Sequence, residues 1–138
     1  MATQIDTLIS DFELLDDWEE RYRYVIELGR GIPAMPDALK SPATKVNGCA
    51  SQVWIHSQLR DEHLVLQGDS DALIVKGLIA IAFMIFAPLS LAEIESVDAQ
   101  AIFAKLGLKD HLTPQRSNGL ASMVARIKAD ARAGLLAR

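Results

Sequence analysis

The stretch VWIHSQLRDEHLVLQGDSDALIVKGLIAIAFMIFA, residues 53–87, decides the fold that this sequence predicts. Its first half alternates with a period of two residues, so that Val53 and Ile55 face one way while Trp54 and His56 face the other. Residues 60–63 can form a turn, and the apolar run at 64–66 returns along the first segment. This pattern is typical of an antiparallel β-hairpin.

The second half of the stretch predicts a buried helix over residues 73–87. Gly68-Asp69-Ser70-Asp71 before it is expected to form a loop and the helix N-cap. The apolar run is too short for a membrane span, which needs about 20 residues. Lys76 interrupts it, and Pro88 ends it. A short helix that is apolar on all sides belongs in the centre of a small domain, so no membrane partner is expected.

The flanking sequence predicts further helices around this unit. Residues 5–15 look helical. A second helix follows, with Asp16 or Asp17 as its N-cap, a core face marked by the helical spacing of Trp18, Tyr22, Val25 and Gly29, and Gly29 and Gly31 at its end. The proline-rich loop 32–44 follows, and Val46 could add a short third strand.

The sequence after residue 88 predicts three more helices. A capping-box pattern at Ser90 opens the first, and the second covers residues 98–106 and stops at Gly107. The third begins at Thr113-Pro114 and carries an apolar stripe of Leu120, Val124, Ile127 and Ala131. The predicted fold is α+β, with a small antiparallel sheet of about three strands packed against several helices, in a single domain over residues 1–138.

Composition excludes several classes of function. The net charge of −4 and the pI near 5.3 provide no basic field for nucleic acid. The N-terminal segment MATQIDTLISDFELLDD carries acidic residues and lacks the pattern of a signal peptide. One cysteine in 138 residues allows no internal disulfide and cannot by itself hold an iron–sulfur cluster. A cytoplasmic, reducing location is therefore the expectation.

That single cysteine, Cys49, lies in the segment KVNGCASQVW, residues 45–54, directly before the predicted hairpin. Asn47-Gly48 favours a sharp turn with Cys49 at or just past its tip. The thiolate is the reactive form of cysteine and a strong nucleophile. A cysteine chosen only for packing would more often lie inside a helix or strand, although a buried filler role stays open.

Other candidate groups give weaker signals. The histidines His56, His63 and His111 are not spaced for a zinc site or for local activation of Cys49, so solvated or capping roles are expected for them. Arg116 would stabilise a thiolate if the fold brought it to the Cys49 loop. The alternative is a surface residue at the start of a helix.

Several segments together resemble the SufE family of sulfur-acceptor proteins, to which CsdE is related. They are GCASQVW at 48–54, GDSDALIVKGLIA at 68–80, RSNGL at 116–120, WEERYRYVIELGRGIP at 18–33 and KSPATKVNGC at 40–49. The resemblance covers nearly the whole chain and implies the fold also used by IscU-type scaffolds. It implies that Cys49 accepts persulfide sulfur from a pyridoxal-phosphate (PLP) cysteine desulfurase, SufS-like or CsdA-like, and stimulates that enzyme. The sulfur then passes to a SufBCD-type scaffold for iron–sulfur cluster assembly.

The resemblance also suggests roles for individual residues. Gly48, Ala50, Ser51 and Gln52 would frame the Cys49 loop and meet the desulfurase. Asp71 matches an acidic position of the GDSD motif and Arg116 matches the family's arginine; structural and functional roles are equally open for both. No metal or cofactor is expected in this chain, because the PLP belongs to the desulfurase.

A lone cysteine suits a carrier, because a second thiol would discharge the persulfide and close a disulfide. Two other interpretations stay open: a partner-independent enzyme that uses Cys49 as nucleophile or redox thiol, and an interaction module in which Cys49 is filler. The stretch QGDSDALIVKGLIA favours the Suf type of partner. Family members also form homodimers, and the sequence does not decide the oligomeric state.

Overall fold

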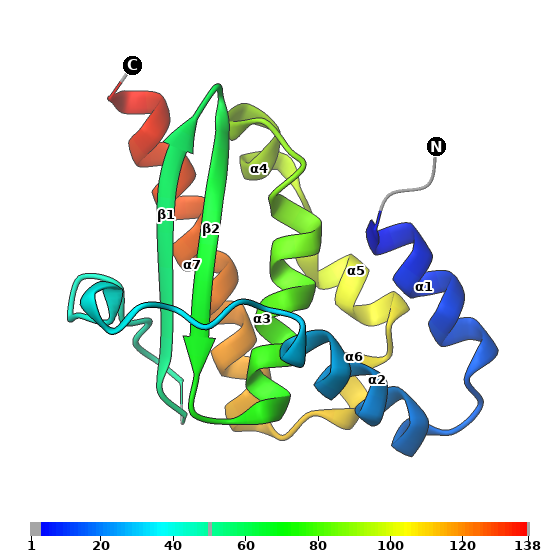
Figure 1. Ribbon diagram of the computed structural model, residues 1–138. Coiled ribbons are helices and arrows are strands. Elements are labelled where there is room, and N and C mark those ends of the chain that lie inside the picture. The colour runs from blue at the N-terminus through cyan, green and yellow to red at the C-terminus, as the bar shows by residue number, and fades with distance from the viewer. Residues whose placement is uncertain (1–3, 50, 138) are drawn as a thin grey trace.

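The computed structural model describes residues 4–49 and 51–137 and has the α+β architecture that the sequence predicts (Figure 1). Two strands, β1 (Val53–Arg60) and β2 (His63–Ser70), form an antiparallel hairpin in which Val53 pairs with Ser70 and Arg60 with His63. Its tight turn places Asp61 and Glu62 at positive φ angles of 50° and 70°. The hairpin predicted from the period-two pattern is confirmed.

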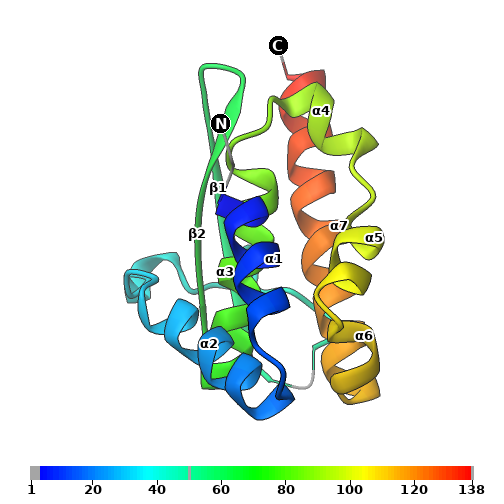
Figure 2. The ribbon, with the colours of Figure 1, turned by 90° about the vertical axis from the view of Figure 1, so that its right-hand side faces the viewer.

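The central helix α3 (Leu73–Phe86) is mostly buried, as expected. It packs against β2, against the N-terminal helices α1 (Gln4–Leu14) and α2 (Trp18–Arg30), and against the C-terminal helix α7 (Pro114–Leu136). Figure 2 shows the sheet nearly edge-on, with α3 and α7 on the same side of it. No helix within the described ranges is both long and apolar enough to cross a membrane.

The remaining helices connect α3 to α7. They are α4 (Leu91–Ser96), α5 (Ala99–Lys105) and α6 (Leu108–His111), and a single 3-10 turn, η1 (Asp37–Leu39), interrupts the proline-rich loop. Side-chain caps occur where the sequence predicts them, at Asp17, Ser90 and Thr113. The predicted core stripe of α7 is buried. The short helix α6 was not predicted.

Two details of the predicted sheet were wrong. The segment 68–70 is not a loop, because β2 continues through Asp69, which pairs with Trp54. Gly68 allows this continuation, since a Cβ there would lie 2.9 Å from both Ile79 Cγ2 and Phe83 Cζ on α3. The segment around Val46 contributes only the isolated bridge Lys45–Trp54, because the chain turns away at Asn47-Gly48.

The predicted cap of α3 was also wrong. Ala72 occupies the N-cap position and provides no side-chain cap. Its amide instead donates to Ser70 Oγ at 3.2 Å. The Asp71 side chain is therefore free for a different contact, which lies at the candidate site.

Candidate functional site

Cys49 lies between the turn at residues 47–48 and the start of β1. Gly48 has a φ of +91°, a conformation that favours glycine. A Cβ on Gly48 would also lie 2.6 Å from Ser122 Oγ of α7. Glycine is thus required at this position by its backbone angle and by the close approach of α7, and the predicted sharp turn before Cys49 is present.

The Cys49 thiol is half-buried and rests against α7. It packs against the hydrophobic core, and its Sγ donates to the Gly119 carbonyl oxygen at 3.6 Å. A Cβ at Gly119 would lie 3.4 Å from Sγ, in ordinary contact, so there is no room there for a side chain much larger than a methyl group. Cys49 therefore lies in a sheltered position at rest.

Burial raises the pKa of the Cys49 thiol. Removing a charged thiolate from water is unfavourable, so the neutral thiol is the favoured form in this position. A reactive cysteine normally has a lowered pKa, produced by nearby cations or a helix N-terminus. The geometry at rest is that of a protected thiol.

Asp71 is connected to the cysteine loop through the backbone. Its Oδ1 accepts a hydrogen bond from the Gln52 amide at 3.1 Å. This bond joins the segment after Cys49 to the β2–α3 turn. The structure thus brings together two of the predicted site residues, Gln52 and Asp71.

The other predicted residues differ in how closely they approach Cys49. Gly48 is its direct neighbour, Ser51 is half-buried two residues further on, and Ala50 lies outside the described residues. Arg116 is half-buried in the first turn of α7, one turn before Gly119. Its guanidinium has no hydrogen-bond or ion-pair partner in the part of the chain that the structure describes. Arg116 therefore lies on the helix that Cys49 contacts, yet the pKa of the thiol is raised.

Two of the three histidines make local contacts away from Cys49. His111 stacks on Trp18 with ring centroids 4.2 Å apart, and His63 Nδ1 lies 2.9 Å from the Leu89 carbonyl oxygen. His56 is half-buried on β1, where its Nδ1 has no hydrogen-bond partner among the described residues. Within residues 4–49 and 51–137, no group of three or more His, Cys, Asp or Glu side chains could hold a metal ion.

Sequence reasoning missed how α7 holds the loop that leads to Cys49. Arg126 Nη2 donates to the Ala43 carbonyl at 2.6 Å and Nη1 to the Lys45 carbonyl at 3.4 Å. Its Nε pairs with Asp130 at 3.1 Å, and Asp130 also accepts from Ser57 Oγ of β1 at 2.6 Å. The i, i+4 spacing of Arg126 and Asp130 predicts an ion pair, but no local pattern identifies the distant carbonyls.

A second missed cluster lies behind the loop. The buried carboxylate of Asp69 pairs with Lys40 and Lys76, each at 3.2 Å, and the Lys40 ammonium lies 5.2 Å from the centre of the Trp54 ring. Burial by itself would raise the pKa of Asp69. Hydrogen bonds from Ser70 N, Lys40 and Lys76, with the charge of Lys76, outweigh burial and hold that pKa below its usual range.

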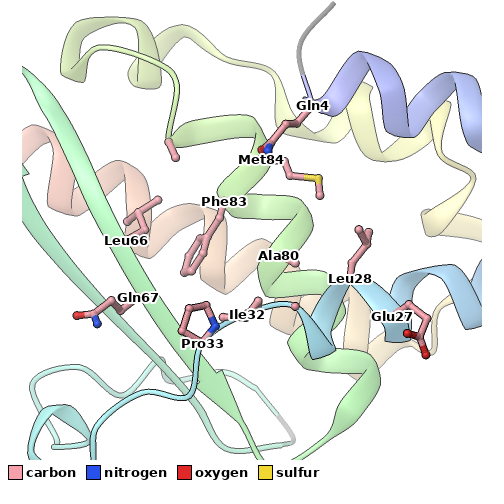
Figure 3. A pocket seen from close by; sticks show the side chains of 12 residues that line it. Gln4, Glu27, Leu28, Ile32, Pro33, Leu66, Gln67, Ala80, Phe83 and Met84 are labelled. Carbon is pink, nitrogen blue, oxygen red and sulfur yellow. The ribbon is translucent and has the colours of Figure 1, made fainter.

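An apolar groove lies away from the Cys49 loop (Figure 3). It has a volume of about 490 Å³ and is lined mainly by apolar side chains of α2, α3, β2 and the loop after α2, including Phe83, Met84, Leu66 and Ile32. None of the predicted site residues lines it. The candidate site is therefore the Cys49 loop and the surface beside it.

Comparisons with known proteins identify the family and the fold of this chain. Residues 6–131 match the family described as "SufE: Fe-S metabolism associated domain". An uncharacterized SufE-like protein of Rhizobium meliloti is 50% identical over 133 residues, covering 94% of this chain and 95% of the relative. A second, from Rhizobium etli, is 48% identical over 132 residues, covering 93% of this chain and 89% of the relative.

The fold has also been seen in a solved structure. The solution structure of a hypothetical protein from Thermus thermophilus superposes with a TM-score of 0.78 at 20% identity, covering 96% of each chain. That likeness supports the α+β fold alone. The match over residues 6–131 and the two relatives near 50% identity show that this chain belongs to the SufE family, whose domain is associated with iron–sulfur metabolism.

Proposed function

We propose that this protein is a sulfur acceptor that takes persulfide sulfur from a PLP-dependent cysteine desulfurase onto Cys49. It stimulates the desulfurase and passes the sulfur to a scaffold that builds iron–sulfur clusters. The observation that carries the proposal is the sheltered state of the only cysteine in the chain. Its thiol donates to Gly119 O and has a pKa raised by burial.

The transfer itself resembles thiol–disulfide exchange. The Cys49 thiolate attacks the outer sulfur of the donor persulfide, and a new bond forms between Cys49 Sγ and that sulfur. The sulfur–sulfur bond of the donor breaks, and the donor cysteine leaves as a thiolate. Cys49 loses one proton and the departing thiolate can take one up, so the step needs no external oxidant or reductant.

The resting geometry favours partner-dependent transfer over a stand-alone enzyme. A cysteine nucleophile that works without a partner needs a base or cation that lowers its pKa, whereas burial raises the pKa of Cys49. Docking of the desulfurase would supply the missing activation by drawing the loop off α7 into the donor's active site. The turn at Gly48 and the few contacts of the loop make this movement possible.

The test is intact mass after this protein is mixed with a cysteine desulfurase and free cysteine and the free thiols are removed. A species one sulfur atom heavier, absent in Cys49→Ser, is expected. An unchanged mass with both SufS-like and CsdA-like desulfurases, each active on free cysteine, would contradict the proposal. Turnover of a substrate by this protein alone would support the stand-alone enzyme instead.

A further inference from the structure

A groove beside the Cys49 loop has a positive lining. It has a volume of about 380 Å³ and is lined by Lys40, Ser41, Pro42, Lys45, Asn47 and Trp54. We call it the basic groove. A second groove of about 350 Å³ shares Lys45 and Asn47 with it and is also lined by Arg126. Because Asn47 is two residues before Cys49, both grooves border the segment that carries the thiol.

The charged residues that line these two grooves are all basic, although Asp37, Asp69 and Asp130 pair with Lys40 and Arg126 from outside the lining. Their charged lining residues are Lys40, Lys45 and Arg126, although the chain as a whole carries a net charge of −4. By contrast, the groove in Figure 3 is lined by the carboxylate of Glu27 as its charged group. The surface beside the cysteine loop is thus basic within an acidic protein.

Lys45 is the cation that remains available to a partner. Lys40 pairs with Asp69 at 3.2 Å, and Arg126 pairs with Asp130 at 3.1 Å. Lys45 is exposed, and its ammonium has no ion-pair or hydrogen-bond partner within the described ranges. A carboxylate that approached the basic groove would therefore meet a cation that no internal acid neutralises.

The backbone under Lys45 is fixed before any partner arrives. Its amide donates to Ser41 O at 3.0 Å, its carbonyl accepts from Arg126, and it forms a bridge with Trp54 of β1. The Lys40 ammonium, 5.2 Å from the centre of the Trp54 ring, fixes two further side chains of the lining. Such preorganisation reduces the conformational entropy that a complex loses on binding.

From these observations we propose that the basic groove docks an acidic segment of the protein that delivers sulfur to Cys49. This inference rests on the proposed function and specifies the chemistry of the partner surface. Carboxylates of the segment pair with Lys45, and its backbone lies along Pro42 and Trp54. The attraction steers the partner to the side of the molecule where the thiol-bearing loop begins.

The first experiment is zero-length coupling of amines to carboxylates with a water-soluble carbodiimide in a mixture with the cysteine desulfurase. Peptide mapping is expected to show Lys45 joined to an Asp or Glu of the desulfurase. Lys45→Arg, which keeps the charge but lacks the amine, should lose this product and retain affinity. Coupling that occurs only at lysines remote from the groove would overturn the proposal.

The second experiment measures the dissociation constant of the complex for Lys45→Glu. We expect it to rise about tenfold at low salt, with a weaker dependence on salt than the unaltered protein shows. Lys105→Glu is the matched control, since Lys105 is exposed on α5. In both views, α5 and the loop after α2, which contributes Lys40, Lys45 and Asn47 to the basic groove, lie on opposite sides of α3 (Figures 1 and 2). For this control, the dissociation constant should change less than about twofold. Equal effects of the two reversals would contradict docking at the basic groove.

The two proposals fail in different ways. Coupling at Lys45 without any gain of mass at Cys49 would uphold docking and contradict the sulfur-acceptor function. Conversely, Lys45→Glu could leave the loading of Cys49 unchanged at limiting desulfurase, with no coupling seen at Lys45. That result would uphold the sulfur-acceptor function and contradict the docking surface.

Discussion

Gly119 places the backbone of α7 against Cys49 with no side chain between them. A methyl group at this position would lie in ordinary contact with Sγ at 3.4 Å, whereas a branched side chain would have to displace the thiol. Gly119→Val should therefore expose Cys49 and raise its rate of reaction with a thiol reagent about tenfold, since overpacking costs about 1–3 kcal/mol. Stopped-flow or colorimetric thiol assays would measure this rate.

Gly119→Ala is the matched control for this steric argument. Alanine is preferred to glycine in a helix interior by about 1 kcal/mol, so the fold should be at least as stable. Its thiol should react at nearly the rate of the unaltered protein. If alanine and valine accelerate the reaction equally, the loss of glycine flexibility, and not side-chain volume, controls the sheltered position.

Asp71 acts on the other side of the cysteine, through the Gln52 amide. Asp71→Ala removes this acceptor, and a hydrogen bond of this kind contributes about 1 kcal/mol. We expect hydrogen exchange of the Gln52 amide to become about fivefold faster. Asp71→Asn keeps an oxygen at the same position and should change the rate little; equal acceleration by both variants would assign the effect to the charge of Asp71 and not to the hydrogen bond.

At the scale of the elements, α2 and α3 cross at a pair of glycines. A Cβ on Gly29 would lie 2.6 Å from Gly77 N, and a Cβ on Gly77 would lie 2.5 Å from Val25 Cγ1 and would overlap the Val25 carbonyl oxygen. Because the obstacle is backbone, the helices must separate. Gly77→Ala should lower the free energy of unfolding by about 3 kcal/mol.

Denaturant unfolding, followed by circular dichroism, would measure this loss. Gly31→Ala is the matched control, because Gly31 is exposed at the end of α2 with a φ of −78° and a Cβ there would lie 3.4 Å from Leu28 O. It should alter the free energy of unfolding by less than about 0.5 kcal/mol. A Gly77→Ala protein as stable as the control would show that the two helices can readjust.

The elements themselves were largely predictable, because their signals are local. The period of two over β1, the caps at Asp17, Ser90 and Thr113, and the apolar run of α3 are all contained in short windows of sequence. The errors arose where a distant partner decides the structure. The local sequence predicts a loop at Asp69. In the structure Asp69 lies in β2, because Lys40 and Lys76 neutralise its buried carboxylate. For the same reason, the sequence could single out Cys49 as a candidate but could not predict its contact with Gly119.

For the molecule as a whole, Asp69 should set part of the stability at acidic pH. Its pKa is lowered in the folded protein, so its contribution is present above the unfolded pKa of about 3.9 and is lost as the pH falls through the folded pKa. Asp69→Asn should lower the free energy of unfolding at pH 7 by about 2 kcal/mol, since two half-buried lysines lose their partner. Its stability should then depend less on pH below about 4.

Urea unfolding at a series of pH values would test this expectation. Asp37→Asn serves as the control, because the Asp37 side chain is 98% exposed and its pairing with Lys40 at 3.7 Å should contribute little. Parallel pH profiles for the two variants would contradict a special role for Asp69.

At alkaline pH the same reasoning applies to Tyr24 with the opposite sign. Its hydrogen bond to Asp11, with burial and the charge of Asp11, raises the pKa of Tyr24 to about 12. The folded protein therefore favours the neutral phenol, and this contribution is lost as the pH rises from about 10 toward 12. Tyr24→Phe should flatten the alkaline limb of the stability profile, which the same urea series would show.

Under the proposed function, the contacts of α7 with the cysteine segment also set how far Cys49 could carry a sulfur atom. Gly119, Ser122, Arg126 and Asp130 follow one another at intervals of about one helical turn, and they touch in order Cys49, Gly48, the 43–45 loop and β1. If only the first two contacts open, the bond from Val46 N to Val53 O still closes the base of the segment. Residues 47–52 then form a tethered arm that extends about 10 Å at most. A donor cysteine buried deeper than that would be out of reach unless Val46 and Val53 also part, so the depth of the partner's active site would decide whether the Lys45–Trp54 bridge opens at each delivery.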